Sequence, residues 1–529
     1  MSAAAGKDLE KAGQKGQPQG YNSGYTGDQQ PVAQPVKPRK RMTLKPIIIT
    51  SVIGAILIIA GLATGISWFA IYNSILSSQL SLTPTSTNYG LWKETPIPMY
   101  LKLYMFNWTN SDAFPLQHDV KPDFKELGPY VFKQVDYKVN TVWNDNNTIT
   151  FQRKRIWRFD KDLSVGTLSD RITNLNPVAA SVAYALRYKS SFMRDMANRV
   201  MLSLEHKLIT TKTVGELLFD GYNDTMLLIA KKLNLSKMPF TKFGWFYGRN
   251  NSETYDGTFN MDTGAADLLD LGMIREWNYS NRTESYKGEC GIISGSNGDL
   301  WPPLPNNETV PIFVTDICTD LKLKFESETT HEGLPGNKYH ADNMLLDDGS
   351  LNRARKCYCE DVECIPSGMM NISSCKFDAP VFVSLPHFYL ADPVYQNAVD
   401  GLDPSKEKHD MELIIQPEAG IPLKVKAQLQ LNVLIQSDSA MSMFKDVKRT
   451  FVPMMWFAQE ASLTPDYASQ VKLLLILPTL GTVTCYGIAG IGFILVFISI
   501  FMFIRRQWQS EDGQTLLPKD DDHDITRIN

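Results

Sequence analysis

Cysteine is the residue type whose number and spacing in this sequence could carry chemistry. Six of the seven cysteines fall in one stretch of the chain, at Cys290, Cys318, Cys357, Cys359, Cys364 and Cys375. Two chemistries use such a set: thiolates can hold a structural zinc ion, and pairs of thiols can oxidise to disulfides. An even number of cysteines suits three disulfides, and the spacing alone leaves every pairing open.

The patterns that build hydrolytic active sites do not occur in the sequence. Gly291–Gly295 reads GIISG, which puts serine in the wrong place for a G-x-S-x-G nucleophile turn. His331 and Glu332 are followed by Gly, Leu and Pro, so they do not form an H-E-x-x-H zinc motif. The seven histidines are scattered, and His387, in the tripeptide PHF, is interpreted as a packed structural residue. We therefore expect neither an enzyme nor a bound metal or cofactor.

Asparagines in the pattern N-x-S/T are acceptors for N-glycosylation. The pattern occurs nine times, at Asn107, Asn146, Asn223, Asn234, Asn250, Asn278, Asn281, Asn307 and Asn371. One such match is weak because the pattern is short, but nine matches within one stretch of chain indicate exposure to the glycosylation machinery. The sequence therefore predicts a glycoprotein whose central part lies outside the cytosol.

Two uncharged apolar segments, at residues 47–72 and 473–504, frame that central part. Each is long enough to cross a bilayer core as a helix. The first is too long and starts too late for a secretory signal, so it is interpreted as a retained anchor. Two spans exclude a soluble protein and a many-span transporter. A two-span ligand-gated channel is disfavoured, because neither span holds an ionisable residue that would mark an ion path.

Basic residues flank the two spans on the sides that face the chain termini. They are Lys37, Arg39, Lys40, Arg41 and Lys45 before the first span, and Arg505 and Arg506 after the second. Such clusters prefer the cytosol, so we expect both termini there and residues 73–472 on the opposite side. An oxidising compartment favours disulfides over a zinc site for the six cysteines. Residues 1–46, rich in Gly, Gln, Pro and Lys, read as a disordered tail.

The net charge and the small residues of the spans also indicate which partners to expect. The net charge is −4, and no basic stripe lies outside the membrane flanks, so we expect no nucleic acid partner. Gly61 with Gly65, and Gly481 with Cys485 and Ala489, would let helices approach closely. Three interpretations stay open for these residues: pairing of the two spans, a homo-oligomer, or the ordinary frequency of glycine in membrane helices. Cys485 is interpreted as a packing residue, with acylation as the alternative.

The central part reads as mixed α and β structure. Thr148–Asp160 alternates apolar and polar residues and predicts a strand. Residues 177–209 predict a helix with an apolar stripe at Phe192, Met196, Val200 and Leu204, and Val214–Lys232 predicts a second helix. The remainder, to about residue 455, has the short apolar runs of a sheet-rich body. Basic residues decorate the helical region and indicate either a ligand-binding surface or a solvated helix face: Arg187, Lys189, Arg194, Arg199, His206 and Lys207.

The C-terminal tail, residues 505–529, contains an acidic dileucine pattern formed by Asp512, Leu516 and Leu517. Clathrin adaptors read such patterns, because a basic patch takes the acid and an apolar pocket takes the two leucines. We favour a sorting signal here over a chance match in a polar tail, as a hypothesis based on a short motif.

Several segments in a fixed order make the chain resemble the class B scavenger receptor family, which includes lysosomal integral membrane proteins. The resemblance covers nearly all of residues 46–510 and rests on Glu126–Phe132 (ELGPYVF), Glu216–Tyr222 (ELLFDGY), Ser294–Asp299 (SGSNGD), Pro386–Phe388, Ala391–Pro393 and Gln416–Pro422. It implies an α+β fold in which two transmembrane helices flank an antiparallel β-barrel-like domain. It also implies a helical apex at about residues 177–232 and an internal lipid tunnel.

The resemblance also implies how the cysteines pair and where ligands bind. By cysteine order, the family pattern joins Cys290 to Cys357, Cys318 to Cys375, and Cys359 to Cys364. The helical apex is where family members meet protein ligands. At the positions of a lysine pair used by surface members, this chain has Ser203 and Glu205. At the position of a histidine used by the lysosomal member it has Ser191, so neither specific recognition is transferred.

These features together predict a lysosomal or late-endosomal membrane glycoprotein that binds a sterol, fatty acid or phospholipid and passes it through a tunnel toward the membrane. The alternative is a scavenger or trafficking receptor whose apex binds lipoproteins, particles or lysosomal enzymes. Residence at the plasma membrane is also open, because dileucine signals serve endocytosis as well.

Overall fold

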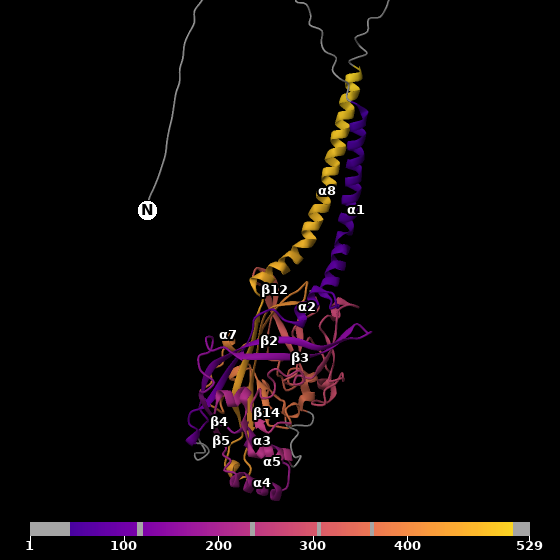
Figure 1. Ribbon diagram of the computed structural model, residues 1–529. Coiled ribbons are helices and arrows are strands. Elements are labelled where there is room, and N and C mark those ends of the chain that lie inside the picture. Colours follow the sequence, from indigo (N-terminus) through magenta and orange to yellow (C-terminus); the bar gives the residue numbers. More distant parts are fainter. Residues whose placement is uncertain (1–42, 114–119, 233–238, 304–307, 360–363, 512–529) are drawn as a thin grey trace, which may run out of the picture. The chain divides into compact units, whose positions relative to one another are not determined.

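The computed structural model describes residues 43–113, 120–232, 239–303, 308–359 and 364–511 (Figure 1). The predicted disordered tail up to residue 42, the sequons at Asn234 and Asn307, and the dileucine residues Asp512, Leu516 and Leu517 lie outside these ranges. The chain divides into two compact units. Among the described residues, unit 1 comprises 43–61 and 487–511, and unit 2 comprises those between 62 and 486.

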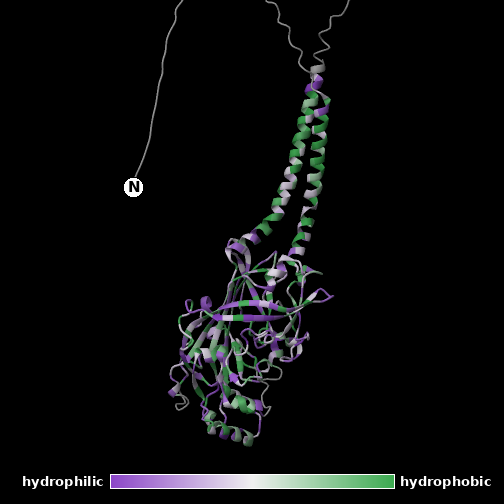
Figure 2. Ribbon diagram, in the orientation of Figure 1, coloured by the Kyte–Doolittle hydropathy of each residue, from purple (hydrophilic) through white to green (hydrophobic). Residues whose placement is uncertain are grey.

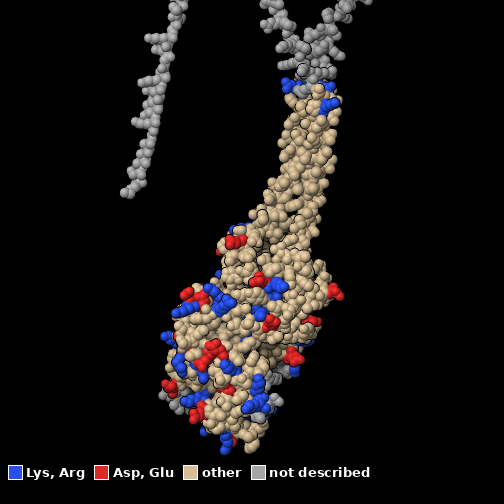
Figure 3. Space-filling view, in the orientation of Figure 1, with Lys and Arg blue, Asp and Glu red and all other residues tan. Residues whose placement is uncertain are grey.

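Two long apolar helices, α1 (Leu44–Leu80) and α8 (Pro465–Glu511), contain the two predicted spans and extend beyond them at both ends. Both helices are long and apolar enough to cross a membrane, and Figure 2 shows their hydrophobic colouring. In unit 1, Lys45, Arg505 and Arg506 lie near the helix ends, and Figure 3 shows blue atoms of Lys and Arg at that end of the helices. The uncharged stretches that predicted the spans are therefore helical.

In unit 1, small and hydroxyl side chains join the two helices. The Oγ atoms of Ser51 and Ser499 are 2.5 Å apart, and Ser499 Oγ also donates to the carbonyl oxygen of Ile47 at 2.8 Å. A Cβ on Gly54 would lie 2.8 Å from the carbonyl oxygen of Gly492, so these backbones approach as closely as glycine allows. Small residues and interhelical hydrogen bonds are the usual means of helix association in lipid.

In unit 2, the same two helices are joined through Trp68. Its Nε1 donates to the carbonyl oxygen of Pro478 at 3.0 Å, and a Cβ on Gly481 would lie 1.9 Å from its ring. A Cβ on Gly65 would lie 3.2 Å from the ring of Tyr486 and 3.5 Å from Cys485. Pairing of the two spans within one chain thus accounts for Gly65, Gly481 and the packing position of Cys485.

The main sheet lies in unit 2 and contains thirteen strands of the described chain, all of whose pairs are antiparallel. Its path runs β10-β11-β12-β15-β16-β17-β1-β2-β3-β8-β9, with β14 added beside β16 and β13 beside β14. The strands are β1 (Met99–Trp108), β2 (Phe124–Trp143), β3 (Thr148–Phe159), β8 (Thr258–Asp262), β9 (Ile274–Trp277), β10 (Thr309–Val314), β11 (Thr319–His331), β12 (Leu334–His340), β13 (Met369–Asn371), β14 (Val381–Ser384), β15 (Glu412–Gln416), β16 (Ile421–Ile435) and β17 (Thr450–Ser462).

Residues 294–297 fill the gap between the two end strands of this path. Ser296 bridges Met273, just before β9, in antiparallel fashion and Ile312 of β10 in parallel fashion. Gly295 has a φ of +96°, and a Cβ there would lie 3.0 Å from the backbone of Pro311, so only glycine fits. We call this closure, formed by residues 294–297 with β9 and β10, the barrel seam. It confirms the predicted α+β fold with a barrel-like antiparallel sheet.

The remaining elements of unit 2 are short. Two small sheets pair β4 (Arg171–Leu175) with β5 (Ile209–Thr213) and β6 (Tyr222–Asn223) with β7 (Lys242–Phe243). The helices are α2 (Thr87–Lys93), α3 (Pro177–Leu186), α4 (Ser191–Ser203), α5 (Thr225–Lys232), α6 (Pro393–Gln396) and α7 (Lys406–His409). Figure 1 shows α3, α4 and α5 gathered near one another at one end of the sheet.

The strand expected at Thr148–Asp160 is confirmed by β3, but the two helices expected in 177–232 are corrected. The first breaks between α3 and α4, because Ser190 leaves the helical conformation and its side chain caps α4 by accepting from the N–H of Met193. The second starts as a five-residue π-helical turn that ends at Gly221, which has a φ of +66°. The Oδ1 of Asp224 then accepts from the N–H of Met226 and begins α5. These polar caps outweigh the apolar periodicity.

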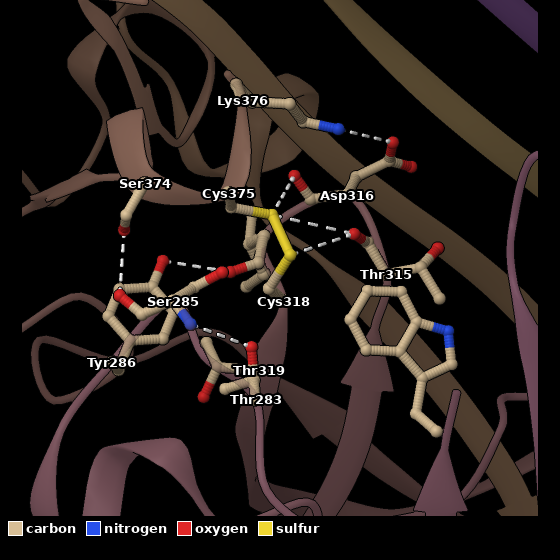
Figure 4. The surroundings of a disulfide bond; sticks show 12 residues. Thr283, Ser285, Tyr286, Thr315, Asp316, Cys318, Thr319, Ser374, Cys375 and Lys376 are labelled. Atoms are coloured by element: carbon tan, nitrogen blue, oxygen red, sulfur yellow. Dashed lines mark hydrogen bonds and ion pairs between the residues drawn. A yellow bond between two sulfur atoms is a disulfide. The ribbon is translucent and has the colours of Figure 1, made fainter. Parts of the chain in front are cut away.

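Three disulfides join the six clustered cysteines: Cys290–Cys357, Cys318–Cys375 and Cys359–Cys364. They are the pairs that the family resemblance implies. Figure 4 shows the surroundings of Cys318–Cys375, where Lys376 pairs with Asp316 and Ser374 donates to the carbonyl oxygen of Ser285. The first two disulfides link the segment near residue 290 to the one near residue 357, and the segment near residue 318 to the one near residue 375.

Candidate functional site

A cavity of about 910 Å³ lies in unit 2 between α3, α4 and α5 on one side and the disulfide-linked segments on the other. Its volume falls at the upper end of the ~300–1,000 Å³ that small-molecule sites occupy. The three helices contribute apolar side chains to its wall, among them Val178, Val182, Met193, Met196, Val200, Met226, Leu227 and Ala230. This composition suits the hydrocarbon part of a ligand.

The opposite wall of the cavity is polar. It is formed by residues 284–287, the Cys357 side of a disulfide, Tyr358, and parts of residues 371–379. On this wall, Lys287 supplies a cation, Ser374 a hydroxyl, and Glu284 and Asp378 carboxylates. Figure 4 shows Ser285 and Tyr286 from the same segment. The hydroxyl of Tyr286 donates to the carbonyl oxygen of Ile317 at 2.9 Å, which fixes the ring in place. The cavity is therefore amphipathic, with an apolar and a polar side.

The helices that form the apolar wall begin at defined caps. The Oδ1 of Asn176 accepts from the N–H groups of Val178 and Ala179, and Pro177 occupies the first turn of α3, where its missing N–H costs nothing. The Oδ1 of Asp224 does the same for the first turn of α5. Because the caps fix where each helix begins, they also fix which side chains reach the cavity.

The six basic residues predicted for the apex lie in different surroundings. Arg187 ends α3, lies at the cavity, and its guanidinium stands 3.5 Å from the ring centroid of Tyr184. Arg194 donates to Asp438 at 2.9 Å, and Arg199 pairs with Asp195 on the surface of α4. Lys189 and Lys207 are exposed. The Nε2 of His206 is 3.6 Å from Asp224 Oδ1. Only Arg187 of the six is a lining residue of the cavity.

The outer side of the same helical region is unusually apolar. Tyr188 is 86% exposed and Phe192 is 72% exposed, and Met193 and Met196 are exposed as well as bordering the cavity. Of the predicted apolar stripe of Phe192, Met196, Val200 and Leu204, only Val200 and Leu204 pack on the core. The beginning of the stripe forms the outer surface and the cavity wall instead.

A buried pair of histidines holds the segment around α7. The rings of His387 and His409 stack with centroids 4.3 Å apart, and their Nδ1 atoms accept from the backbone N–H groups of Asp403 and Ser405, each at 3.0 Å. His387 Nε2 is 2.6 Å from Glu126, which also accepts from Trp456. His387 is thus the packed structural residue that the sequence predicts.

Electrostatics in this cluster favour a neutral imidazole at His409 and an ionised carboxylate at Glu126. Burial, with the positive charge that His387 can carry as a second cause, lowers the pKa of His409 to about 4. Burial by itself raises the pKa of Glu126, but the hydrogen bonds from His387 and Trp456 outweigh it, so this pKa lies below its usual value. The cluster binds no group of the cavity wall and is a structural element.

A second buried ionic group lies on β2 and β3. Asp136 and Lys138 are fully buried, Arg153 pairs with Asp136, and the Nζ of Lys138 is 3.1 Å from Asp299. Burial raises the pKa of Asp136, but Arg153 and Lys138 lower it far more, so the carboxylate stays ionised. Among the described residues, no three His, Cys, Asp or Glu side chains converge as a metal site.

The seven described sequons lie in unit 2, which contains the barrel. Asn146, Asn223, Asn250, Asn278 and Asn281 are exposed, and Asn107 and Asn371 are partly buried. Asn371 also borders the amphipathic cavity. Their occupancy by glycans stays a prediction.

Local sequence patterns do not reveal the cavity, because its wall comes from segments that are far apart in the chain. Met196 and Val200 belong to the apolar period predicted on one helix, and Met193 lies outside that period. Lys287 and Ser374 carry no local signal that relates them to those residues. Only the amphipathic helix pattern, combined with the exposed Phe192, could have indicated a partly open apolar site.

Comparison with known proteins gives consistent matches over most of the chain. Residues 52–503 match the model of the CD36 family. Protein peste of Drosophila melanogaster is 33% identical over 433 residues, which is 82% of this chain and 78% of that protein. Scavenger receptor class B member 1 of Mus musculus is 30% identical, covering 84% of this chain and 87% of the relative. Lysosome membrane protein 2 of Rattus norvegicus is 30% identical, covering 80% and 87%.

Proposed function

Because this chain belongs to the CD36 family, we propose that it is a two-span membrane protein that takes a lipid into the cavity beside α3, α4 and α5 and passes it toward the membrane. The observation that carries the proposal is the amphipathic cavity of about 910 Å³. Each buried CH₂ group of a lipid tail gains about 0.8 kcal/mol, so an apolar wall of this size can hold a tail against water. Such transfer requires binding and release, and no catalytic group.

The two walls of the cavity suggest how a lipid would lie. The tail would contact Met193, Met196 and Val200, and methionine suits this role because its flexible side chain adapts to different shapes. The head group would meet Lys287 and Ser374 on the polar wall. A carboxylate or phosphate would meet Lys287 beside the carboxylates of Glu284 and Asp378, and a sterol hydroxyl would find hydrogen-bond partners among these groups and Ser374. Fatty acid, phospholipid and sterol therefore remain the ligand classes.

Filling the cavity is expected to abolish lipid labelling. Ala197 and Ala230 line the apolar wall on α4 and α5, and Ala197→Trp or Ala230→Trp would place an indole in the space of the tail. Cells that express the full chain would be given photo-crosslinkable fatty acid and sterol probes, and lipid bound to the purified protein would be counted. We expect labelling to fall by at least about tenfold, equivalent to ~1.4 kcal/mol of binding free energy.

Leu202→Trp is the matched control for these variants. Leu202 lies on the same helix as Ala197, is 51% exposed and is not a lining residue of the cavity. This variant should be labelled like the parent protein. Equal labelling of the parent and both cavity variants, with all of them folded and at equal amounts, would refute the cavity as the lipid site.

We propose a lysosomal or late-endosomal location, with both termini in the cytosol, on the basis of the tail signal and the basic flanks. Replacing Leu516 and Leu517 with alanine should move the protein from lysosomes to the cell surface, because adaptors lose the apolar half of the signal. Surface biotinylation and co-localisation with a lysosomal marker measure this shift, and Leu473→Ala in the second span is the control. Unchanged lysosomal residence would mean that the dileucine is not the sorting signal.

The second candidate function is a receptor that captures lipoproteins, particles or enzymes at the helical region. Exposed Tyr188 and Phe192 beside Arg187 and Lys189 favour it, because exposed aromatic side chains next to cations are common at protein interfaces. The cavity experiment distinguishes the two functions. A protein that carries no lipid label, in the parent as in the variants, would move the assignment to this surface.

A further inference from the structure

A second recess, of about 370 Å³, lies against the barrel seam. It is lined by three short pieces of chain: residues 273–275 at β9, residues 281–282, and residues 292–295. Its volume is within the ~300–1,000 Å³ of small-molecule sites. The recess is separate from the amphipathic cavity, with which it shares no lining residue.

One of the lining residues, Asn281, is the acceptor of a predicted N-glycosylation sequon, Asn281-Arg282-Thr283. Its backbone is held tightly, because its carbonyl oxygen accepts from the N–H of Ile293 at 3.0 Å and Arg282 bridges Ile292. The N–H of Thr283 also donates to the carbonyl oxygen of Gly291 at 2.8 Å. A sugar on Asn281 would therefore start from a fixed point at the edge of the recess.

The chemistry of the recess matches a sugar. Met273 and Ile292 offer apolar contact for a pyranose face and an acetamide methyl group, and Arg275 and Arg282 offer guanidinium donors for hydroxyl and carbonyl oxygens. Arg275 already pairs with Asp262 and Asp270, and Arg282 with the carbonyl oxygen of Gly288. Each guanidinium has five N–H donors, so donors remain for a ligand. The recess thus combines an apolar surface with oriented hydrogen-bond donors.

We propose that this recess is the seat of the chain's own N-linked glycan on Asn281, and that the seated glycan strengthens the barrel seam. The first N-acetylglucosamine residues would pack on residues from β9 and from the closing segment 292–295 at once. A ligand that contacts both sides of a closure stabilises it by binding only the closed form. The proposal rests on occupancy of the Asn281 sequon and is independent of the proposed lipid function.

Asn278 provides a matched reference three residues away. It is an exposed sequon asparagine whose Oδ1 accepts from the N–H of Thr258, and it is not a lining residue of the recess. Asn146 is a second exposed reference on the same unit. A glycan on either residue would project into solvent without a seat.

The test is the rate at which an amidase removes each glycan from the native, full-length protein in detergent, followed by glycopeptide mass spectrometry. We expect release at Asn281 to be about tenfold slower than at Asn278 and Asn146, which corresponds to ~1.4 kcal/mol of protection. Unfolding the protein first should remove the difference. Equal native rates at the three sites, or an unmodified Asn281, would overturn the proposal.

Two variants complete the test. Ser294→Phe fills the recess from residue 294, which lines it, and should make Asn281 release as fast as Asn278 release. Where this variant fails to fold, Asn281→Gln is compared with Asn278→Gln by thermal unfolding. Loss of the seated glycan should lower the midpoint, and loss of the Asn278 glycan should not. Equal midpoints for these two variants would contradict a role of the glycan at the seam.

Discussion

Replacing Asp136 with alanine is expected to lower the free energy of unfolding by about 3–5 kcal/mol, because buried cations would lose their counterion. Asp136 and Lys138 are both fully buried, and Arg153 donates to the same carboxylate. The Nζ of Lys138 is 3.5 Å from Asp136 and 3.1 Å from Asp299. Removing Asp136 leaves three charges in the low-dielectric interior where four were balanced. A loss of this size is a large part of the stability of an ordinary domain.

Chemical denaturation of the purified full-length protein would measure this loss. Asp136→Asn separates charge from volume, because the amide has nearly the shape of the carboxylate, and it should be almost as destabilising as alanine. Asp195→Ala is the matched control, since it breaks the exposed pair with Arg199 on α4 and should cost only about 0.3–0.5 kcal/mol. Equal decreases in the free energy of unfolding for Asp136→Ala and Asp195→Ala would show that burial does not increase the contribution of the Asp136 network to stability.

Acidification from pH 6.5 to about 4 is expected to destabilise the protein progressively through the buried His409. The pKa of His409 is lowered from 6.5 to about 4 by burial and by His387. Between these two values the unfolded state binds more protons than the folded state, so stability falls as the pH falls. The lowered pKa of Glu126 acts in the same direction below its ordinary value of 4.5.

Geometry explains why the folded state resists protonation of His409. A proton on Nδ1 of His409 would displace the hydrogen bond from the N–H of Ser405 and place a cation against the stacked ring of His387. Lys408 and Lys426 add further positive charge near His409. Glu126 is the one opposing acid among the described groups that act on His409, and it already accepts from His387 and Trp456.

Thermal midpoints across this pH range would test the effect. His409→Gln keeps a side-chain acceptor near Ser405 but removes the titrating imidazole, so its midpoint should change less between pH 6.5 and pH 4 than that of the parent. His331→Gln on β11 controls for histidine substitution as such. If the parent and His409→Gln lose the same number of degrees over this interval, the histidine pair is not the source of acid sensitivity.

Local patterns in the sequence were sufficient to predict the membrane helices and β3 and to identify the family. Uncharged apolar stretches predict α1 and α8, because a bilayer core requires continuous apolar length and that is a property of neighbouring residues. Alternation predicts the strand at Thr148 for the same local reason. The order of motifs such as SGSNGD identifies the family, and Ser296 and Gly295 within that motif close the barrel seam.

Alternation of apolar and polar residues does not show which face of a strand other elements will cover. In β2, residues from distant parts of the sequence cover the polar face. In the segment Val135–Val139, Asp136 and Lys138 occupy the polar face, which a strand read in isolation would expose to water. Arg153 and Asp299 convert that face into a buried ionic network. Gln428, Gln430 and Asn432 alternate in the same way on β16 and are fully buried.

The apex and the cavity were decided by tertiary structure for a related reason. Ser190 and Asp224 break the predicted helices, because a side-chain cap that satisfies free N–H groups outweighs a continued apolar period. The cavity then needs wall residues from α3, α4 and α5 together with Lys287 and Ser374. Sequence patterns are enough to predict the two candidate membrane spans and the family that the chain resembles. The fold decided which polar residues are buried and which apolar residues stay open to a ligand, because both depend on partners that only folding brings together.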